Sequence, residues 1–164
     1  SAAGLPPSFA AMLIARLHRH SAERHTLALS LDDRPLASVE LETRSFLVHD
    51  LVHWCVEAEL ELDEGFWGLL ASGVPLEVLN DREMPPSTFT TLGQVEGLVG
   101  PLQSYLQGRL PRQLLVEALP ASFTPANLSG VEARFKTALG AWKATPFGAA
   151  LELTWPPGAP VVIS

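Results

Sequence analysis

The feature that most constrains the fold is an alternation of apolar and polar side chains in the first third of the chain. Leu27, Leu29 and Leu31 share one side of such a run. Neighbouring side chains of a strand point to opposite faces, so this period predicts strands with one buried face. The runs are short and joined by turn-forming residues such as Asp32–Pro35, which favours an antiparallel meander. The predicted strands are Met12–His20, His25–Leu31 and Leu36–Thr43.

The middle of the chain changes to the helical period. Thr43 or Ser45 can cap a helix that extends to about Leu62. Pro101 falls inside a later helical pattern, where it predicts a kink or two short helices. Thr124 is positioned to cap the helix that opens with Pro125. The remaining helices are predicted over 66–73, 92–106, 111–119 and 125–143, with a long loop over 74–90.

The last alternating segment, with Leu151, Leu153 and Trp155 on one side, predicts a strand that returns to the meander. Strands, then helices, then a closing strand indicate an α+β fold. We expect one domain over residues 1–164, with a small antiparallel sheet of about four strands packed against four or five helices. Residues 1–11 are expected to be a loose arm or foreign to the native chain, and residues 156–164 a tail.

The chemically distinctive stretch is SFLVHDLVHWCVEAEL, within the predicted helix of residues 46–62. His49, His53 and Glu57 line up on the side opposite a broad apolar arc. Histidines four residues apart lie one helical turn apart, so both imidazoles can bind one metal. The pattern predicts a divalent-metal site, with zinc or another transition metal that imidazole favours.

Further ligands must come from carboxylates or from other histidines. Glu57 suits the orientation of an imidazole ring better than direct binding, because a third residue on the same helix strains to reach the same ion. If the site is catalytic, water activated by the metal would make the protein a hydrolase or lyase acting on a small molecule. The carboxylate candidates are Asp50, Glu57 and Glu64, with Glu61 nearby, and the histidines of the predicted strands are His18, His20 and His25.

Two resemblances accompany this motif. His49, Asp50, His53 and Glu64 resemble, over about sixteen residues, the metal-binding motif of the coenzyme Q biosynthesis family that has HDxxH and a downstream glutamate. That resemblance implies a metal-ligand set. The longer strings VELETRSFLVHDLVHWCVEAELELDEGFWGLL and ATPFGAALELTWP resemble a family of small uncharacterised bacterial proteins. This second resemblance implies a bacterial, cytoplasmic protein with the same order of strands and helices.

Two readings without a metal stay open. His49, His53 and their neighbouring carboxylates can form a solvated or partly packed helix face. The chain can also be a metal-free interaction domain, such as a homodimer, that uses an apolar surface around Phe66, Trp67 and Leu70. Cys55 lies on the apolar arc, where an inert buried thiol is expected.

Composition excludes several functional classes. The net charge is −7 and the pI is about 5.1, which disfavours binding to nucleic-acid phosphates and to anionic membranes. No GxGxxG, P-loop or GxSxG motif occurs, so no nucleotide cofactor is expected. The chain has one cysteine and no apolar run that could span a bilayer, which favours the cytoplasm. HExxH zinc peptidases carry a glutamate after the first histidine as the general base, whereas this chain has the shorter Asp50 there. This difference disfavours a zinc peptidase.

Overall fold

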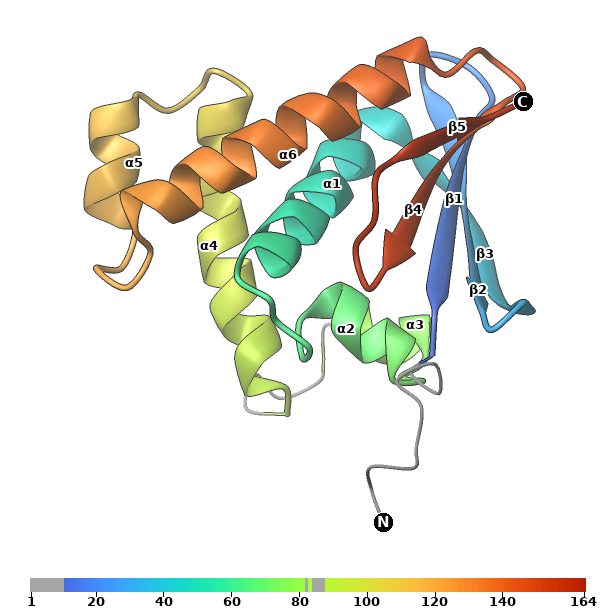
Figure 1. Cartoon of the computed structure of the whole chain (residues 1–164), viewed down its shortest axis with the longest axis horizontal. Coiled ribbons are helices and arrows are strands. Elements are labelled where there is room, and N and C mark those ends of the chain that lie inside the picture. The colour runs from blue at the N-terminus through green and yellow to red at the C-terminus, as the bar shows by residue number, and fades with distance from the viewer. Residues whose placement is uncertain (1–10, 82, 84–87) are drawn as a thin grey trace.

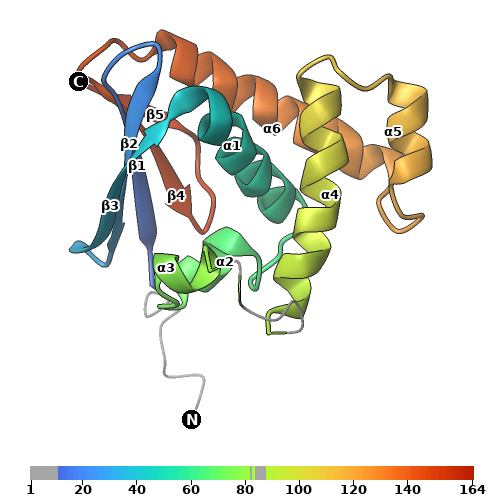
Figure 2. The same ribbon diagram turned by 180° about the vertical axis from the view of Figure 1, so that it is seen from behind.

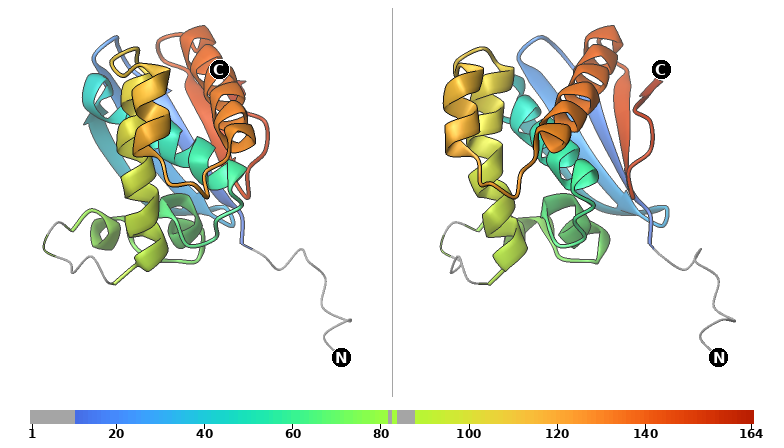
Figure 3. Two further views of the ribbon diagram at one scale, coloured as in Figure 1. Left: turned by 90° about the vertical axis from the view of Figure 1, so that its left-hand side faces the viewer. Right: turned by 60° about the vertical axis from the view of Figure 1, so that its left-hand side comes forward.

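A five-stranded antiparallel sheet and helices on one of its sides form the fold (Figure 1). The structure is a computed structural model that describes residues 11–81, 83 and 88–164. Seen from the side, the helices stand on one side of the sheet (Figure 3). The strand order is β3-β2-β1-β4-β5. The strands are β1 (Leu13–Arg19), β2 (Arg24–Leu31), β3 (Arg34–Glu42), β4 (Ala150–Trp155) and β5 (Val161–Ile163). The α+β class and the meander are confirmed.

The β2–β3 hairpin turns at Asp32 and Asp33, whose φ angles are +48° and +65°. Two successive positive φ angles match the right-handed twist of the strands that the turn connects. The predicted apolar side of β2 is buried, with exposed fractions of 2% for Leu27 and Leu29 and 8% for Leu31. The returning strand is also confirmed, because β4 pairs with β1.

The end of the chain corrects one prediction. Residues 156–164 were expected to be a tail, but Val161–Ile163 form β5 and pair with β4. Three β-branched residues in a row favour an extended conformation. Three prolines at positions 156, 157 and 160 come just before these residues, and such prolines usually indicate a loop, so the strand was not predicted. The sheet therefore has five strands rather than about four.

In the described part of the chain, six helices lie on one side of the sheet. They are α1 (Thr43–Glu59), α2 (Phe66–Ala71), α3 (Leu76–Leu79), α4 (Thr90–Leu106), α5 (Arg112–Ala118) and α6 (Pro125–Ala144). The predicted Thr124 cap is confirmed by a reciprocal pair of hydrogen bonds with Asn127. The predicted loop over 74–90 contains α3, and its residues 82 and 84–87 lie outside the described chain.

The ends of α1 and the continuity of α4 differ from the predictions. Glu42, not Thr43 or Ser45, occupies the N-cap of α1. The helix ends at Glu59 rather than Leu62, because Glu61 adopts a positive φ of 53°. Pro101 lies inside a single 17-residue helix, so two short helices are not formed.

Helix α1 lies at the centre of the helical layer, against α4 on one side and α6 on another (Figure 2). Its buried residues include Leu51, Val52 and Trp54. The apolar surface predicted around Phe66, Trp67 and Leu70 is wrong, since all three belong to the core with exposed fractions of 9%, 1% and 1%. These side chains are buried because α2 packs against α1 and β4.

Candidate metal centre

His49 and His53 of α1 meet Glu96 of α4. One ligand atom from each residue lies within 4.8 Å of the other two. Nε2 of His53 is 3.2 Å from Oε1 of Glu96, and Nε2 of His49 is 3.9 Å from Oε2 of Glu96. Ligand atoms about 2.1 Å from a tetrahedral zinc lie roughly 3.4 Å apart. The two distances involve different oxygens of Glu96, and the group as a whole spans up to 4.8 Å, so the side chains would have to close in slightly to bind one small cation.

The other nitrogen of each ring faces a fixed acceptor. Nδ1 of His53 donates to Oε2 of Glu57 at 3.2 Å, and Nδ1 of His49 donates to Oε1 of Gln103 at 3.2 Å. A carboxylate or amide oxygen can only accept, so each Nδ1 carries its hydrogen. Both Nε2 atoms are thereby turned toward Glu96. Metal-binding histidines in proteins show this arrangement, in which an outer acceptor fixes the ring.

Glu57 is itself held by the start of α2. Its carboxylate accepts hydrogen bonds from the backbone N–H groups of Phe66 at 2.9 Å and Trp67 at 2.8 Å. A Cβ atom at Gly65 would overlap this carboxylate, so the chain can pass here only without a side chain. Glu57 is fully buried, and its hydrogen bonds link the imidazole of His53 to the start of α2.

The charges of the cluster favour an imidazolium at His53 in the metal-free protein. Burial alone would lower the pKa of His53, but hydrogen bonds to Glu57 and Glu96 outweigh it and raise the pKa to about 9. The same hydrogen bond lowers the pKa of Glu96, against a smaller opposing effect of burial. The carboxylates of Glu57 and Glu96, on either side of the ring, therefore stabilise the protonated and positively charged form of His53.

Asp50 lies beside this cluster but is not one of the three grouped residues. Its side chain is largely buried, and burial raises the pKa of the carboxyl to about 7, opposed by the charge of His53 and reinforced by Glu96. Its backbone oxygen accepts a hydrogen bond from Nε1 of Trp67 at 3.3 Å. Asp50 therefore adds an ionisable group to the edge of the site.

The other candidates from the sequence lie elsewhere. Glu61 and Glu64 are exposed in the loop after α1. His25 is buried with its Nδ1 2.9 Å from Oγ1 of Thr43, and His20 contacts the hydroxyl of Thr26. None of these residues, nor His18, belongs to the group around Glu96.

Exposure falls steeply along the site. The side chains of Glu96 and His49 are 51% and 38% exposed, whereas His53 and Glu57 are 2% and 0% exposed. The solvated helix face is therefore wrong for His53 and Glu57, because α2 and α4 cover that side of α1. A ligand from solvent would approach from the side of His49 and Glu96.

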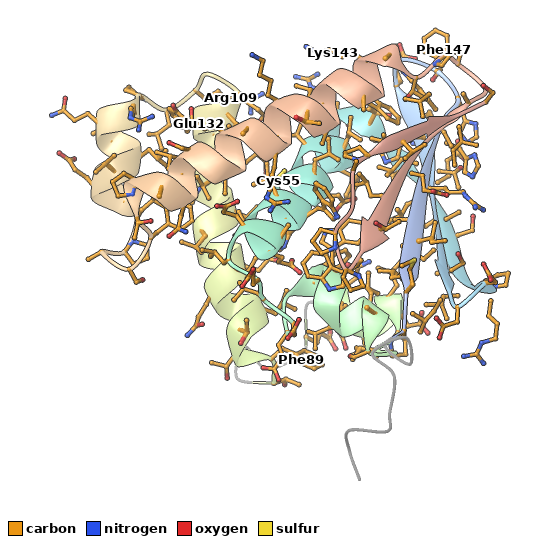
Figure 4. All side chains as sticks on the ribbon, viewed as in Figure 1. Cys55, Phe89, Arg109, Glu132, Lys143 and Phe147 are labelled. Carbon is orange, nitrogen blue, oxygen red and sulfur yellow. The ribbon has the colours of Figure 1, made fainter. Side chains whose placement is uncertain are left out.

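Cys55 is confirmed as a buried thiol. It lies on α1 and is labelled in Figure 4, and its exposed fraction is 0%. Burial raises the pKa of the thiol to about 12, with a small opposing effect from Arg134. A thiol that stays protonated is a poor ligand and a poor nucleophile. Cys55 is also not one of the three residues grouped around Glu96.

Glu96 and Gln103 were missed from the sequence. Both occur within the predicted helix, beside the apolar stripe of Leu92, Val95, Val99 and Leu102. Seven residues separate them, so they share one face of α4. This spacing could have predicted that Glu96 and Gln103 lie on the same face. It could not predict that α1 packs against that face, because such packing joins segments far apart in the chain.

Comparisons with known proteins give no functional information about this site. No protein-family model matches the chain, and the comparisons with curated proteins and with solved structures found no match. The two resemblances noted from the sequence therefore stay predictions. Within the described part of the chain, no helix combines the length and the apolar character needed to cross a bilayer.

Proposed function

We propose that this protein binds a divalent transition metal, with zinc as the first choice, through Nε2 of His49, Nε2 of His53 and the carboxylate of Glu96. The proposal is carried by one observation. Both Nδ1 atoms are held by outer acceptors, while both Nε2 atoms face the same carboxylate. Two imidazoles and one carboxylate form a ligand set of catalytic zinc, and also of non-haem iron(II).

We further propose that the metal serves the hydrolysis or lyase chemistry of a small molecule. Three protein ligands leave a coordination position free, whereas purely structural zinc sites are usually closed by four. A metal here would polarise a substrate oxygen and lower the pKa of a bound water. The half-exposed side chains of His49 and Glu96 leave that position reachable from solvent.

A metal-free role is the rival, and one observation favours it. Both nitrogens of His53 already have carboxylate partners, Glu57 and Glu96, each at 3.2 Å. An imidazolium between two carboxylates is a complete charge cluster, buried at His53 and Glu57 and half-exposed at Glu96, that holds α1 and α4 together. In that case the cluster would be structural, and added metal would leave the protein unchanged.

Thermal unfolding of the demetallated protein separates the two roles. A metal present at about 100 times its dissociation constant adds about 2.7 kcal/mol of stability. For a chain of this size that raises the midpoint by several degrees, at roughly 2–4 °C per kcal/mol. Zinc, manganese and iron(II) are each added to the wild type and to the variants His49→Ala and Glu96→Gln. We expect a shift in the wild type that both variants lose.

The control is Glu117→Gln, which makes the same change at an exposed position of α5. It should keep the full shift. An unchanged midpoint in the wild type with all three metals would overturn the proposal and favour the structural cluster. Where a metal binds, the loaded wild type and the loaded Glu117→Gln protein are screened with ester, amide and lactone substrates. Turnover that Glu96→Gln lacks would support the hydrolase.

A further inference from the structure

Gln103, a residue of α4, contacts the proposed ligand His49 from outside the ligand set. Its amide oxygen lies 3.2 Å from Nδ1 of His49. The side chain is only partly buried, unlike Glu57. We propose that Gln103 is a positioning residue, which fixes the tautomer and the ring orientation of His49 so that Nε2 is available to a metal. The metal part of this proposal rests on the proposed function.

The first step concerns the hydrogen on the ring. A neutral imidazole carries one N–H, on either Nδ1 or Nε2. The oxygen of Gln103 can only accept, so it stabilises the tautomer with hydrogen on Nδ1. In that tautomer Nε2 presents a lone pair toward Glu96, 3.9 Å away. That distance exceeds a hydrogen bond, and two electron-rich groups at this spacing are stabilised by a shared cation.

The second step concerns how the two helices share the work. Helix α1 supplies His49 and His53 together with Glu57, which holds His53. Helix α4 supplies Glu96 together with Gln103, which holds His49. Each helix thus contributes at least one ligand and one outer acceptor. His53 is held by a residue of its own helix, whereas His49 is held by a residue of α4. The rings of His49 and His53 are inclined by 66° with centroids 4.8 Å apart, so neither ring is stacked flat on the other.

The third step distinguishes Gln103 from Glu57 as an experimental target. Glu57 also accepts hydrogen bonds from the start of α2, so its replacement disturbs the fold as well as the site. Within the described residues, the side chain of Gln103 forms a single hydrogen bond, the one to His49. Replacing Gln103 should therefore alter the orientation of His49 and leave the fold intact. Loss of such an outer acceptor typically costs 10–100-fold in metal affinity.

The test compares Gln103→Leu and Gln103→Glu with the wild type. Leucine cannot accept a hydrogen bond, whereas glutamate accepts more strongly. The matched control is Gln94→Leu, the same change at an exposed position of the same helix. Zinc and cobalt(II) are the probes, with dissociation constants from competition with a chelator and the visible spectrum of the cobalt form as readouts. Far-ultraviolet circular dichroism confirms that each variant is folded.

We expect Gln103→Leu to weaken zinc binding at least tenfold and to shift the cobalt spectrum. Gln103→Glu and Gln94→Leu should both keep wild-type affinity or better. Equal affinity and an identical cobalt spectrum in the wild type and Gln103→Leu would overturn the positioning role, even though the metal site itself would stand. If the wild type binds neither zinc nor cobalt, both the proposed function and this metal role fail.

A second readout needs no metal. Nitrogen-15 NMR of the demetallated protein, recorded where the ring of His49 is neutral, reports which of its two nitrogens carries the hydrogen. We expect the Nδ1–H form for His49 in the wild type and in Gln94→Leu, and a gain of the Nε2–H form in Gln103→Leu. An unchanged tautomer in Gln103→Leu would overturn the assignment whether or not a metal binds.

Discussion

His53 and Glu57, one turn apart on α1, form a buried ion pair in which Nδ1 lies 3.2 Å from Oε2. The same carboxylate accepts hydrogen bonds from the backbone N–H groups at the start of α2. One side chain therefore orients the buried histidine and anchors the segment that follows α1. This dual attachment explains why a fully buried glutamate is stable here, since a buried charge needs both a counter-charge and hydrogen bonds.

Replacing Glu57 should therefore destabilise the whole fold. Glu57→Gln removes the buried counter-charge of His53 and sets an amide N–H against the donors of Phe66 and Trp67. We expect a loss of about 3 kcal/mol in the free energy of unfolding, as found when one partner of a buried pair is removed. Urea unfolding measures it. Glu61→Gln, at an exposed loop position, should change stability little, and an equal loss in both variants would contradict the role of Glu57.

Metal affinity should rise with pH. Nε2 of His53 must lose its hydrogen before it binds a metal, and hydrogen bonds to Glu57 and Glu96 overcome burial to raise the pKa of His53 to about 9. Below that pH, each unit of increase should tighten zinc binding, by at most about tenfold. Competition titrations in chelator-buffered zinc, at several pH values below 9, measure this slope. A flat profile would mean that the proton on His53 does not compete with the metal.

Acid should weaken the fold through His25. Burial, assisted by the charges of His20 and Arg24, lowers the pKa of His25 from 6.5 to about 4. The unfolded chain therefore binds a proton at this residue between those two pH values when the folded chain does not. The free energy of unfolding from this residue falls as the pH drops through that window, by up to about 1.4 kcal/mol per unit.

Asp50 acts in the opposite direction over an overlapping range, because burial raises the pKa of its carboxyl from 3.8 to about 7. The wild-type profile alone therefore does not isolate His25. The informative quantity is the difference in unfolding free energy between the wild type and His25→Leu, followed by urea titration at each pH. We expect the free energy of unfolding of the wild type, minus that of His25→Leu, to decrease as the pH falls from 6.5 to about 4. A difference independent of pH would contradict the assignment.

Helix α4 should tolerate an added methyl group at Gly97. A Cβ atom there would meet no other atom within 4 Å, and glycine inside a helix costs roughly 0.5–1 kcal/mol relative to alanine. Gly97→Ala should therefore raise the thermal midpoint by about 1–4 °C. The contrasting variant is Gly68→Ala in α2, whose Cβ would overlap the backbone of Asp63 and lower the midpoint. A lower midpoint in Gly97→Ala would mean that this face of α4 is covered in solution.

The sequence by itself determined the local elements. Alternation at Leu27, Leu29 and Leu31 identified a strand and its buried face. The pair Thr124 and Pro125 located the start of α6. The four-residue spacing of His49 and His53 placed two imidazoles on one side of a helix. All these features depend on residues close together in the chain, where side-chain direction follows from the period of the backbone.

The tertiary structure decided what lies opposite each of those faces. It brought Glu96 and Gln103 to the histidines, buried His53 and Glu57, and left Glu64 in solvent. It also paired Val161–Ile163 with β4. Periodicity in one helix cannot specify these neighbours, because the partner is set by how helices pack across the core. That packing joins residues 43 or more positions apart, such as His53 and Glu96, and depends on the shapes of the side chains packed between the helices.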